Sequence, residues 1–371
     1  MSRATGAIIN LAALRHNLRR VREIAPNSRI MSVVKANAYG HGITAVAHAL
    51  SETDAFAVAS LDEALVIRRA GLAHPIVLLE GVFGADELDE AARNGCDVVV
   101  HEIGQLELIE TSHLRHSLSV WLKVDSGMNR LGFPLGQARS MWQRLSAAQA
   151  VRGPVRLMTH LACADDVNSS RTSAQLQRFA EATAGIEVER SIANSAGILA
   201  WPDSHADWVR PGILLYGVSP FADRCGADER LLPVMTMSTQ LIAIRHLQPG
   251  ETVGYGGVWA APEALSVGIA AIGYGDGYPR HAPNGTPVLV NGGLCPLAGR
   301  VSMDMIAVDL RTVPDAKVGD PVIAWGPALP VEQVAQAAGT IPYELLCGVT
   351  QRVKFSVVDK NETPAVSAAG V

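Results

Sequence analysis

The segment MSVVKANAYGHG, residues 31–42, joins the end of an apolar run to a lysine and a glycine-containing loop. Residues 30–34 read as a buried β-strand. Lys35 therefore stands at the carboxyl end of a strand, where burial disfavours the ammonium form. The amine can then act as a nucleophile, a base or a Schiff-base former. A strand-end lysine that simply reaches water is the structural alternative.

The same strand-then-loop pattern recurs along the first two-thirds of the chain. Apolar runs alternate with amphipathic stretches, in which Asn10 is placed as one helix cap and Ser60 with Glu63 as a capping box for another. Such alternation indicates a parallel sheet covered on both faces. Eight units favour a closed (β/α)8 TIM-type barrel over an open doubly wound sheet, and no G-x-G-x-x-G fingerprint follows the first strand. The predicted strands are residues 30–35, 55–60, 75–80, 97–101, 119–125, 155–161, 189–194 and 208–216.

From about residue 231 the sequence changes in character. Strand-like runs separated by Gly and Pro predict a smaller, mainly β domain with one helix. We therefore expect two domains, residues 1–230 and 231–371. The tail, residues 365–371, is small and apolar and is expected to be poorly ordered. The predicted elements of the second domain are strands at residues 235–247, 264–272, 286–290, 305–310 and 321–325, and a helix at residues 331–338.

The composition excludes several classes of protein. The chain has 371 residues, 48% of them hydrophobic and 18% charged, with a net charge of −5 and no basic run suited to nucleic acid. Its five cysteines are scattered without a C-x-x-C pair, which speaks against a disulfide framework or a zinc site and for a reducing compartment. No signal peptide and no apolar stretch of membrane-spanning length is evident. We expect a soluble cytoplasmic protein with no metal, membrane or nucleic-acid partner.

Polar and glycine-rich residues gather where the predicted barrel strands end, which is where barrels place their active sites. The loops after strands seven and eight often bind phosphate in barrels, so a phosphate there and Lys35 on strand one fit a phosphorylated aldehyde cofactor. Each residue also has a structural alternative: His160 as a satisfied core histidine, Ser195 as a helix N-cap, Arg210 in a surface ion pair. Tyr255, between glycines, could be a turn aromatic. The strand-end residues are Lys35, Tyr39, Lys123, Asp125, Arg130, His160, Asn194 to Gly197, and Arg210 to Ile213.

Several strings between residues 8 and 354 resemble alanine racemases of the pyridoxal-phosphate-dependent fold type III. The ten-residue string VVKANAYGHG around Lys35 is the most specific of them. Ser302 is a local variation, because some relatives carry cysteine there. The other strings are KVDSGMNRLG, TH at residues 159–160, NSAG, VRPGILLYG, VGYG, IGYGDGYPR, GRVSMDM and PYELLC.

The resemblance implies a role for each matching residue. Lys35 forms the internal aldimine with pyridoxal 5'-phosphate and serves as one base, and Tyr255 is the opposite base. Arg210 faces the pyridine nitrogen with His160 behind it. Arg130 and the backbone N–H of Met303 engage the substrate carboxylate. The phosphate is held by Tyr39, Ser195, Gly212, Ile213 and Tyr343.

The family also implies a homodimer with shared active sites. Tyr255, Tyr274, Met303 and Asp304 would then come from the partner's β domain. Lys123 and Arg130 are two cations that would converge on one substrate site and repel each other. Some alanine racemases carbamylate the equivalent lysine, which would convert Lys123 into an anion that accepts a hydrogen bond from Arg130. An ordinary Lys123 paired with Asp125 or another acid is the alternative.

The predicted function is therefore the interconversion of L- and D-alanine by a two-base mechanism, which supplies D-alanine. A broad-specificity amino-acid racemase on the same scaffold is one alternative, and a non-catalytic pyridoxal-phosphate-binding protein is another. A basic amino-acid decarboxylase is a weaker alternative, because it would normally oppose the pyridine nitrogen with a carboxylate rather than Arg210. The sequence does not distinguish a biosynthetic from a catabolic role, nor does it give the breadth of substrates, the kinetic constants or the dimer affinity.

Overall fold

The computed structural model describes residues 4–359, so the tail expected to be poorly ordered lies outside the described residues. The chain divides into two compact units. One consists of Asn17–Ala38 and Gly42–Leu215, and the other of Met1–His16, Tyr39–His41 and Tyr216–Val371. The boundary predicted at residues 230 and 231 thus differs from this division. Residues 216–230 and Tyr39–His41 group with the β-rich unit, and residues 6–10 pair with its strands.

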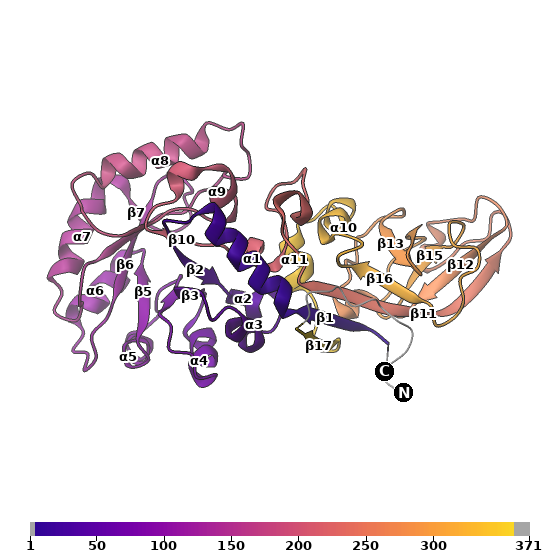
Figure 1. Cartoon of the computed structure of the whole chain (residues 1–371), viewed down its shortest axis with the longest axis horizontal. Coiled ribbons are helices and arrows are strands. Elements are labelled where there is room, and N and C mark those ends of the chain that lie inside the picture. The colour runs from indigo at the N-terminus through magenta and orange to yellow at the C-terminus, as the bar shows by residue number, and fades with distance from the viewer. Residues whose placement is uncertain (1–3, 360–371) are drawn as a thin grey trace. The chain divides into compact units, whose positions relative to one another are not determined.

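The first unit is a closed parallel barrel, as the sequence predicts. Strands β2 to β5 pair in sequence order, β5 pairs with β6, and the ring continues through β8, β9 and β10 back to β2. Trp208 of β10 lies opposite Arg29 of β2 at this closure. Figure 1 shows the strands inside and the helices α4 to α8 outside. The barrel strands are β2 (Arg29–Val33), β3 (Ala55–Val58), β4 (Ile76–Leu78), β5 (Cys96–Val100), β6 (Val120–Asp125), β8 (Arg156–Met158), β9 (Arg190–Ser191) and β10 (Trp208–Val209), and β7 (Phe133–Pro134) pairs beside β6.

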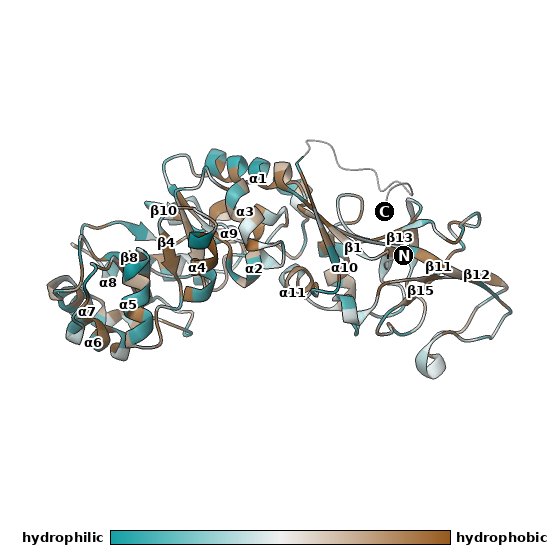
Figure 2. Cartoon of the chain, turned by 90° about the horizontal axis from the view of Figure 1, so that it is seen from below, coloured by the Kyte–Doolittle hydropathy of each residue, from teal (hydrophilic) through white to brown (hydrophobic). Residues whose placement is uncertain are grey.

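The helices begin where the sequence places their caps. Asn10 Oδ1 accepts the backbone N–H groups of Ala12 and Ala13 at the start of α1 (Leu11–Ile24), and Ser60 Oγ accepts that of Glu63 at the start of α4. Strands β3, β4 and β5 are buried throughout. In Figure 2 hydrophobic colour lies on β4 and hydrophilic colour on much of the outer helix α5. The segment α2 (Lys35–Tyr39) is a left-handed turn. The remaining helices are α3 (Ile43–Ala49), α4 (Leu61–Arg69), α5 (Ala85–Arg93), α6 (Ile103–Thr111), α7 (Ala138–Ala147), α8 (Arg171–Ala182) and α9 (Ser195–Ala200), with 3-10 turns η1 (Leu135–Gln137), η2 (Pro202–Ser204) and η3 (Ile213–Tyr216).

Two tryptophans fill the amino end of the barrel. The rings of Trp121 and Trp208 meet edge to face, with centroids 6.1 Å apart. Each indole N–H donates to a carboxylate, from Trp121 to Asp97 over 3.2 Å and from Trp208 to Glu189 over 2.9 Å. This end therefore contributes packing and stability, and the opposite end is free for chemistry. An arginine lies over each ring and pairs with the same carboxylate, Arg156 at Trp121 and Asp97, and Arg29 at Trp208 and Glu189.

The second unit is mainly β and contains a strand from each end of the described chain. β1 (Gly6–Asn10) runs antiparallel to β11 and parallel to β17, within the order β14-β13-β16-β11-β1-β17, and β12 joins β11 and β15. The predicted limits of β11, β16 and α10 match the structure, whereas β1, β14 and β17 are not predicted. Among the described residues no helix is long and apolar enough to cross a bilayer. The elements are β11 (Met235–Leu247), β12 (Leu265–Ala270), β13 (Pro287–Val290), β14 (Gly293–Pro296), β15 (Ile306–Asp309), β16 (Pro321–Trp325), β17 (Lys354–Val358), α10 (Val331–Ala338), α11 (Pro342–Cys347), η4 (Gly226–Glu229), η5 (Tyr255–Gly257) and η6 (Tyr274–Asp276).

Candidate active site

Arg210 is a buried cation held by neutral groups. Its guanidinium donates to Ser191 Oγ over 2.6 Å, to the Thr159 carbonyl over 2.6 Å and to the Ile192 carbonyl over 3.2 Å. The residue is 4% exposed, so it is not the surface ion-pair residue considered from the sequence. Burial lowers the pKa of Arg210 to about 10, which leaves the group protonated at neutral pH. The barrel thus fixes a permanent positive charge after β10.

His160 lies directly against this cation. Its Nδ1 is 3.3 Å from Arg210 Nη2. Burial and then the positive charges of Arg210, Lys123, Arg130 and Lys35 hold the pKa of His160 well below its usual value. The imidazole is therefore neutral, accepts from Arg210 at Nδ1 and carries its own proton on Nε2. It supports Arg210 without adding a second positive charge.

Lys123 lies in the same group of cations. It is 8% exposed, and burial followed by the charges of Arg210, Arg130 and Lys35 lowers its pKa to about 8. The Asp125 carboxylate raises the pKa of Lys123, but its effect is the smallest of the five that act on this pKa. Its Oδ1 accepts the backbone N–H groups of residues 127, 128 and 129, so the carboxylate organises its own loop. Four basic side chains therefore share the carboxyl end of the barrel, an arrangement suited to anionic ligands.

Lys35 follows β2 and opens a left-handed turn. The φ angles of the next four residues, Ala36 to Tyr39, lie between 52° and 55°. A left-handed conformation costs roughly 1–2 kcal/mol for each residue with a Cβ, so surrounding contacts must hold the turn. Three of them are the Ala38 N–H to the Val34 carbonyl (2.9 Å), the Ile43 N–H to Asn37 Oδ1 (2.9 Å) and the Ala36 N–H to Glu63 Oε1 (2.6 Å).

The loops after β9 and β10 meet through one hydrogen bond. Ser195 Oγ accepts the backbone N–H of Gly212 over 3.0 Å, and Ser195 is only 5% exposed. The N-cap of α9 is Asn194, which accepts the Gly197 N–H over 2.9 Å, so Ser195 is not a simple cap. Ile213, directly after Gly212, is fully buried. Hydroxyl and backbone N–H groups of these loops are the donors that a phosphate needs.

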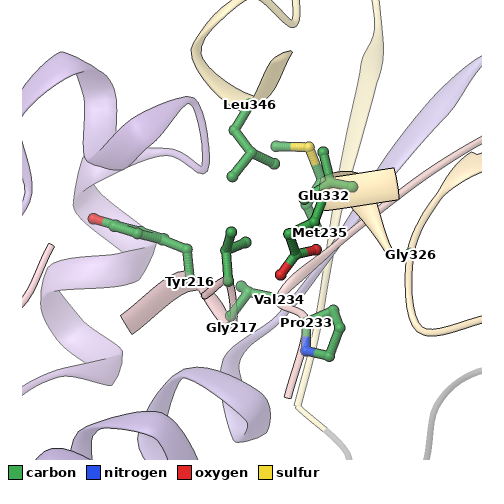
Figure 3. Close-up of a pocket in the computed structure, with 10 residues that line it drawn as sticks. Tyr216, Gly217, Pro233, Val234, Met235, Gly326, Glu332 and Leu346 are labelled. Atoms are coloured by element: carbon green, nitrogen blue, oxygen red, sulfur yellow. The ribbon is translucent and has the colours of Figure 1, made fainter. Parts of the chain in front are cut away.

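Tyr39 and Tyr343 lie together in the β-rich unit. The Tyr39 ring stacks on Tyr216 with centroids 4.7 Å apart, and Tyr343 is 6.0 Å from Tyr39. Burial raises the pKa of Tyr39, with smaller contributions from Tyr343 and Cys347, so its phenol stays protonated and can donate a hydrogen bond. Tyr216 also lines a cavity of about 10 Å³ together with Glu332 (Figure 3). That volume holds about one water molecule and no cofactor.

The residues assigned to a partner's site also belong to the β-rich unit and are exposed. Tyr255 is 68% exposed, Met303 52% and Tyr274 39%. Tyr255 stands in a tight turn with Gly254 and Gly256 at φ 75°, as the alternative for this residue suggested, and a turn does not exclude chemistry. The Tyr274 N–H donates to the Ser302 carbonyl over 3.0 Å, which joins the two loops. Asp304 pairs with Arg352 over 2.6 Å.

Sequence reasoning missed a group of buried polar residues beneath the barrel site. Gln175 donates to Ser126 Oγ (3.2 Å) and to the His160 carbonyl (3.1 Å), and its own carbonyl accepts the Ala162 N–H (2.9 Å). Ser126 and Thr159 are hydrogen bonded to each other over 2.9 Å. A hydroxyl within or at the end of an apolar run, as at Thr159 or Ser191, is the signal that could have drawn attention to them.

Models of two protein domains match nearly the whole chain. "Alanine racemase, N-terminal domain" matches residues 9–220, and "Alanine racemase, C-terminal domain" matches residues 234–357. The chain belongs to the alanine racemase family.

Individual alanine racemases agree with this assignment over nearly their full length. That of Nitrosococcus oceani is 58% identical over 347 residues, which is 94% of this chain and 97% of the relative. That of Coxiella burnetii is 49% identical over 365 residues, 97% of this chain and all of the relative. The crystal structure of biosynthetic alanine racemase from Pseudomonas aeruginosa has a TM-score of 0.94 at 46% identity and covers 96% of this chain and 99% of its own. The Bartonella henselae enzyme, solved with covalently bound pyridoxal phosphate, has a TM-score of 0.86 at 30% identity. The match covers 96% of this chain and 99% of that enzyme.

Members of the alanine racemase family depend on pyridoxal phosphate, and the barrel residues fit that cofactor. Its phosphate needs N–H and hydroxyl donors, which Ser195 and Gly212 bring together. Its aldehyde needs an amine, and Lys35 stands at the end of β2. Its pyridine nitrogen can accept a hydrogen bond from a permanent cation such as Arg210. The chemistry of the donor set therefore matches each polar part of the cofactor.

Proposed function

We propose that this chain is a pyridoxal-phosphate-dependent racemase that interconverts L-alanine and D-alanine and so supplies D-alanine. The observation that carries the proposal is Arg210, a buried cation held by Ser191, Thr159 and neutral His160. A decarboxylase of basic amino acids would normally place a carboxylate at the pyridine nitrogen, whereas a fixed guanidinium there discourages its protonation. This limits how far charge spreads from the reacting carbon and suits a proton removed and quickly returned.

Each cofactor group has a proposed partner in the chain. Lys35 would bind the aldehyde carbon and Arg210 the pyridine nitrogen. When bound, pyridoxal phosphate supplies the electron sink that makes the α-hydrogen of alanine acidic. The residues proposed for the phosphate are Tyr39, Ser195, Gly212, Ile213 and Tyr343.

Two bases on opposite faces of the substrate account for racemisation. A proton must leave the α-carbon from one face and return to the other, and one fixed base cannot serve both faces. We assign Lys35 to one face and Tyr255 to the other. Arg130 and the backbone N–H of Met303 bind the substrate carboxylate, which sets the orientation of the α-hydrogen.

Lys123 is proposed to carry a carbamate. A pKa of about 8 leaves roughly a tenth of the amine neutral at pH 7, and the neutral amine is the form that attacks carbon dioxide. The ammonium first loses one proton to give the neutral amine, and forming the N–C bond then releases a second proton, so a buried cation becomes an anion. The anion accepts a hydrogen bond from Arg130 and removes one of the repelling charges from the site.

The active form is proposed to be a homodimer with shared active sites. Tyr255 and Met303 are more than half exposed. Asp304, which follows Met303, is also exposed, and so is Tyr274, whose loop is hydrogen bonded to Ser302. Exposed aromatic and methionine side chains are typical of subunit interfaces. We place these four residues in the partner's site. All five cysteines carry free thiols, which supports a reducing compartment such as the cytoplasm.

Chiral chromatography tests the proposed reaction directly. The purified protein is loaded with pyridoxal phosphate and incubated separately with L-alanine and with larger and polar L-amino acids. We expect L-alanine to reach an equal mixture of enantiomers, because the two have the same free energy, while the other amino acids react much more slowly. Comparable rates for all of them would indicate a broad-specificity racemase, and no D-amino acid from any would indicate a binding protein.

A further inference from the structure

Glu63 makes an unusual pair of contacts at the start of α4. In a capping box, the glutamate at this position accepts the N–H of the capping residue, which is Ser60. Ser60 Oγ does accept the Glu63 N–H, over 3.5 Å. The carboxylate instead accepts the Ala59 N–H at Oε2 over 2.9 Å and the Ala36 N–H at Oε1 over 2.6 Å. Half of the predicted capping box is therefore replaced by a contact to another strand end.

The second contact holds the peptide that directly follows Lys35. Ala36 is the first of the residues with positive φ, and side chains with a Cβ rarely adopt that conformation without support. The Ala36 N–H would otherwise point toward water at the exposed start of the turn. Glu63 thus connects the end of β2 to the end of β3 at the point where Lys35 leaves the sheet.

We propose that Glu63 is a positioning residue that fixes the direction of Lys35 through the Ala36 peptide. The inference rests on the proposed function, in which Lys35 binds the cofactor and moves a proton. Because the backbone after Lys35 is strained, a small rotation of the Ala36 peptide changes where the lysine side chain begins. A catalytic group displaced by about 1 Å can lose about 100-fold in rate.

The contact requires both oxygens of a carboxylate. Two backbone N–H groups face Glu63, one at each oxygen, and each needs an acceptor. Glutamine has the same shape but offers one oxygen and one NH₂ group, so one of the two N–H groups would face another donor. Aspartate keeps the charge but is one methylene shorter, so it reaches one N–H at most.

The test compares Glu63→Gln with Asp62→Asn. Asp62 is the neighbouring acid in the first turn of α4 and is exposed, so its substitution removes the same charge from the same helix end. Hydrogen exchange of the cofactor-free protein is measured for the peptide covering residues 34–43. We expect Glu63→Gln to raise exchange there by at least about tenfold while α4 keeps its protection. Asp62→Asn should leave both segments unchanged.

Kinetics of the loaded enzyme give the second readout. We expect Glu63→Gln to lower kcat by about tenfold or more with little change in KM, because substrate binding uses other residues. Asp62→Asn should match the original protein. If Glu63→Gln does not fold, Glu63→Asp is measured in the same way and should show the same two effects.

The outcomes separate this inference from the proposed function. If the original protein racemises alanine, and Glu63→Gln shows unchanged hydrogen exchange at residues 34–43 and unchanged kcat, the role of Glu63 is overturned and the proposed function is not. A chain that does not racemise alanine overturns the proposed function, while the exchange measurement still reports on the Ala36 contact. Loss of fold in Glu63→Gln together with normal behaviour of Glu63→Asp would show a role in stability rather than in positioning.

Discussion

Arg210 donates a hydrogen bond from Nη2 to Nδ1 of His160, with the two nitrogens 3.3 Å apart. The pair works only while His160 is neutral, because a protonated imidazole would have no acceptor to offer at Nδ1. Two adjacent buried cations would also repel each other. The cation that faces the proposed cofactor site is thus held by a histidine that the surrounding charges keep unprotonated.

This relationship makes the stability of the fold depend on pH. The pKa of His160 is lowered in the folded chain, so below about pH 6.5 the unfolded chain binds a proton that the folded chain does not. Stability therefore falls as the pH falls from about 6.5, by at most about 1.4 kcal/mol per pH unit from this one group. We expect His160→Gln to reduce that slope in urea unfolding between about pH 5 and 7.

The exposed His113 provides the control for this measurement. His113→Gln should reduce that slope less than His160→Gln does. Equal slopes in the original protein and in His160→Gln would contradict a neutral, unprotonated His160.

Tyr255→Phe should separate the two faces of the reaction. The phenol is assigned to remove the proton from L-alanine, and Lys35 the proton from D-alanine. We expect the variant to lose exchange of the α-hydrogen with deuterated water when it starts from L-alanine, and to retain that exchange from D-alanine. Mass spectrometry of each recovered enantiomer measures the exchange. Undiminished exchange from L-alanine would remove Tyr255 from its assigned role.

Lys123→Ala should lose activity and regain part of it with added anions. The substitution removes the proposed carbamate, so Arg130 loses the acceptor that holds it for the substrate carboxylate. Chloride or a small carboxylate can occupy the space left by the side chain and accept the same hydrogen bond. The measurement is kcat/KM against anion concentration, with the original protein as control for salt effects. The proposal is contradicted if the intact original protein lacks the added mass of carbon dioxide and added anions restore no activity to Lys123→Ala.

Arg352→Ala should destabilise the β-rich unit. Arg352 pairs with fully buried Asp276 over 3.1 Å and with exposed Asp304 over 2.6 Å. Removing the guanidinium leaves a buried carboxylate with fewer partners, whereas the half-exposed arginine limits the effect. We expect urea unfolding to show a lower free energy of unfolding for Arg352→Ala, because Asp276 is fully buried. Arg93→Ala on α5 breaks only exposed ion pairs with Asp89 and Glu90 and should cost no more than about 1 kcal/mol.

The sequence predicts the barrel well because each strand is a short apolar run followed by polar residues. The structure confirms all eight runs as strands. The run at residues 189–194 forms only the two-residue β9, and the run at residues 208–216 forms only the two-residue β10 and then the turn η3. In the run at residues 208–216, the Pro211 carbonyl still accepts the Val33 N–H over 3.0 Å, but Pro211 has no N–H to donate and Gly212 weakens a strand, so the ladder ends there. β1 and β17 were missed because each depends on a partner far away in sequence, and β17 is largely exposed and lacks an apolar run.

In the candidate site, too, the sequence predicts some residues and misses the contacts of others. Motif strings place Lys35, Arg210 and Ser195 at strand ends, and simple topology then brings strand ends together. The contacts of Glu63 and Gln175 depend on side-chain direction across neighbouring elements, which no local pattern contains. The Ser60 and Glu63 capping box shows the limit clearly. Its spacing predicts the start of α4 correctly and cannot reveal that the carboxylate reaches Ala36.

Activity should depend on two chains meeting. Lys35 belongs to the barrel unit and Tyr255 to the β-rich unit, and we propose that each active site takes one from each subunit. Lys35→Ala and Tyr255→Ala are each expected to be inactive alone. After mixing under conditions that allow subunit exchange, hybrid dimers contain one site with both original residues and one with neither. A statistical mixture is half hybrid, so activity should recover to about a quarter of the original value per chain. Mixing two differently tagged samples of Lys35→Ala is the control and should give no activity. If tagged hybrids are isolated and remain inactive, both bases of a site come from the same chain.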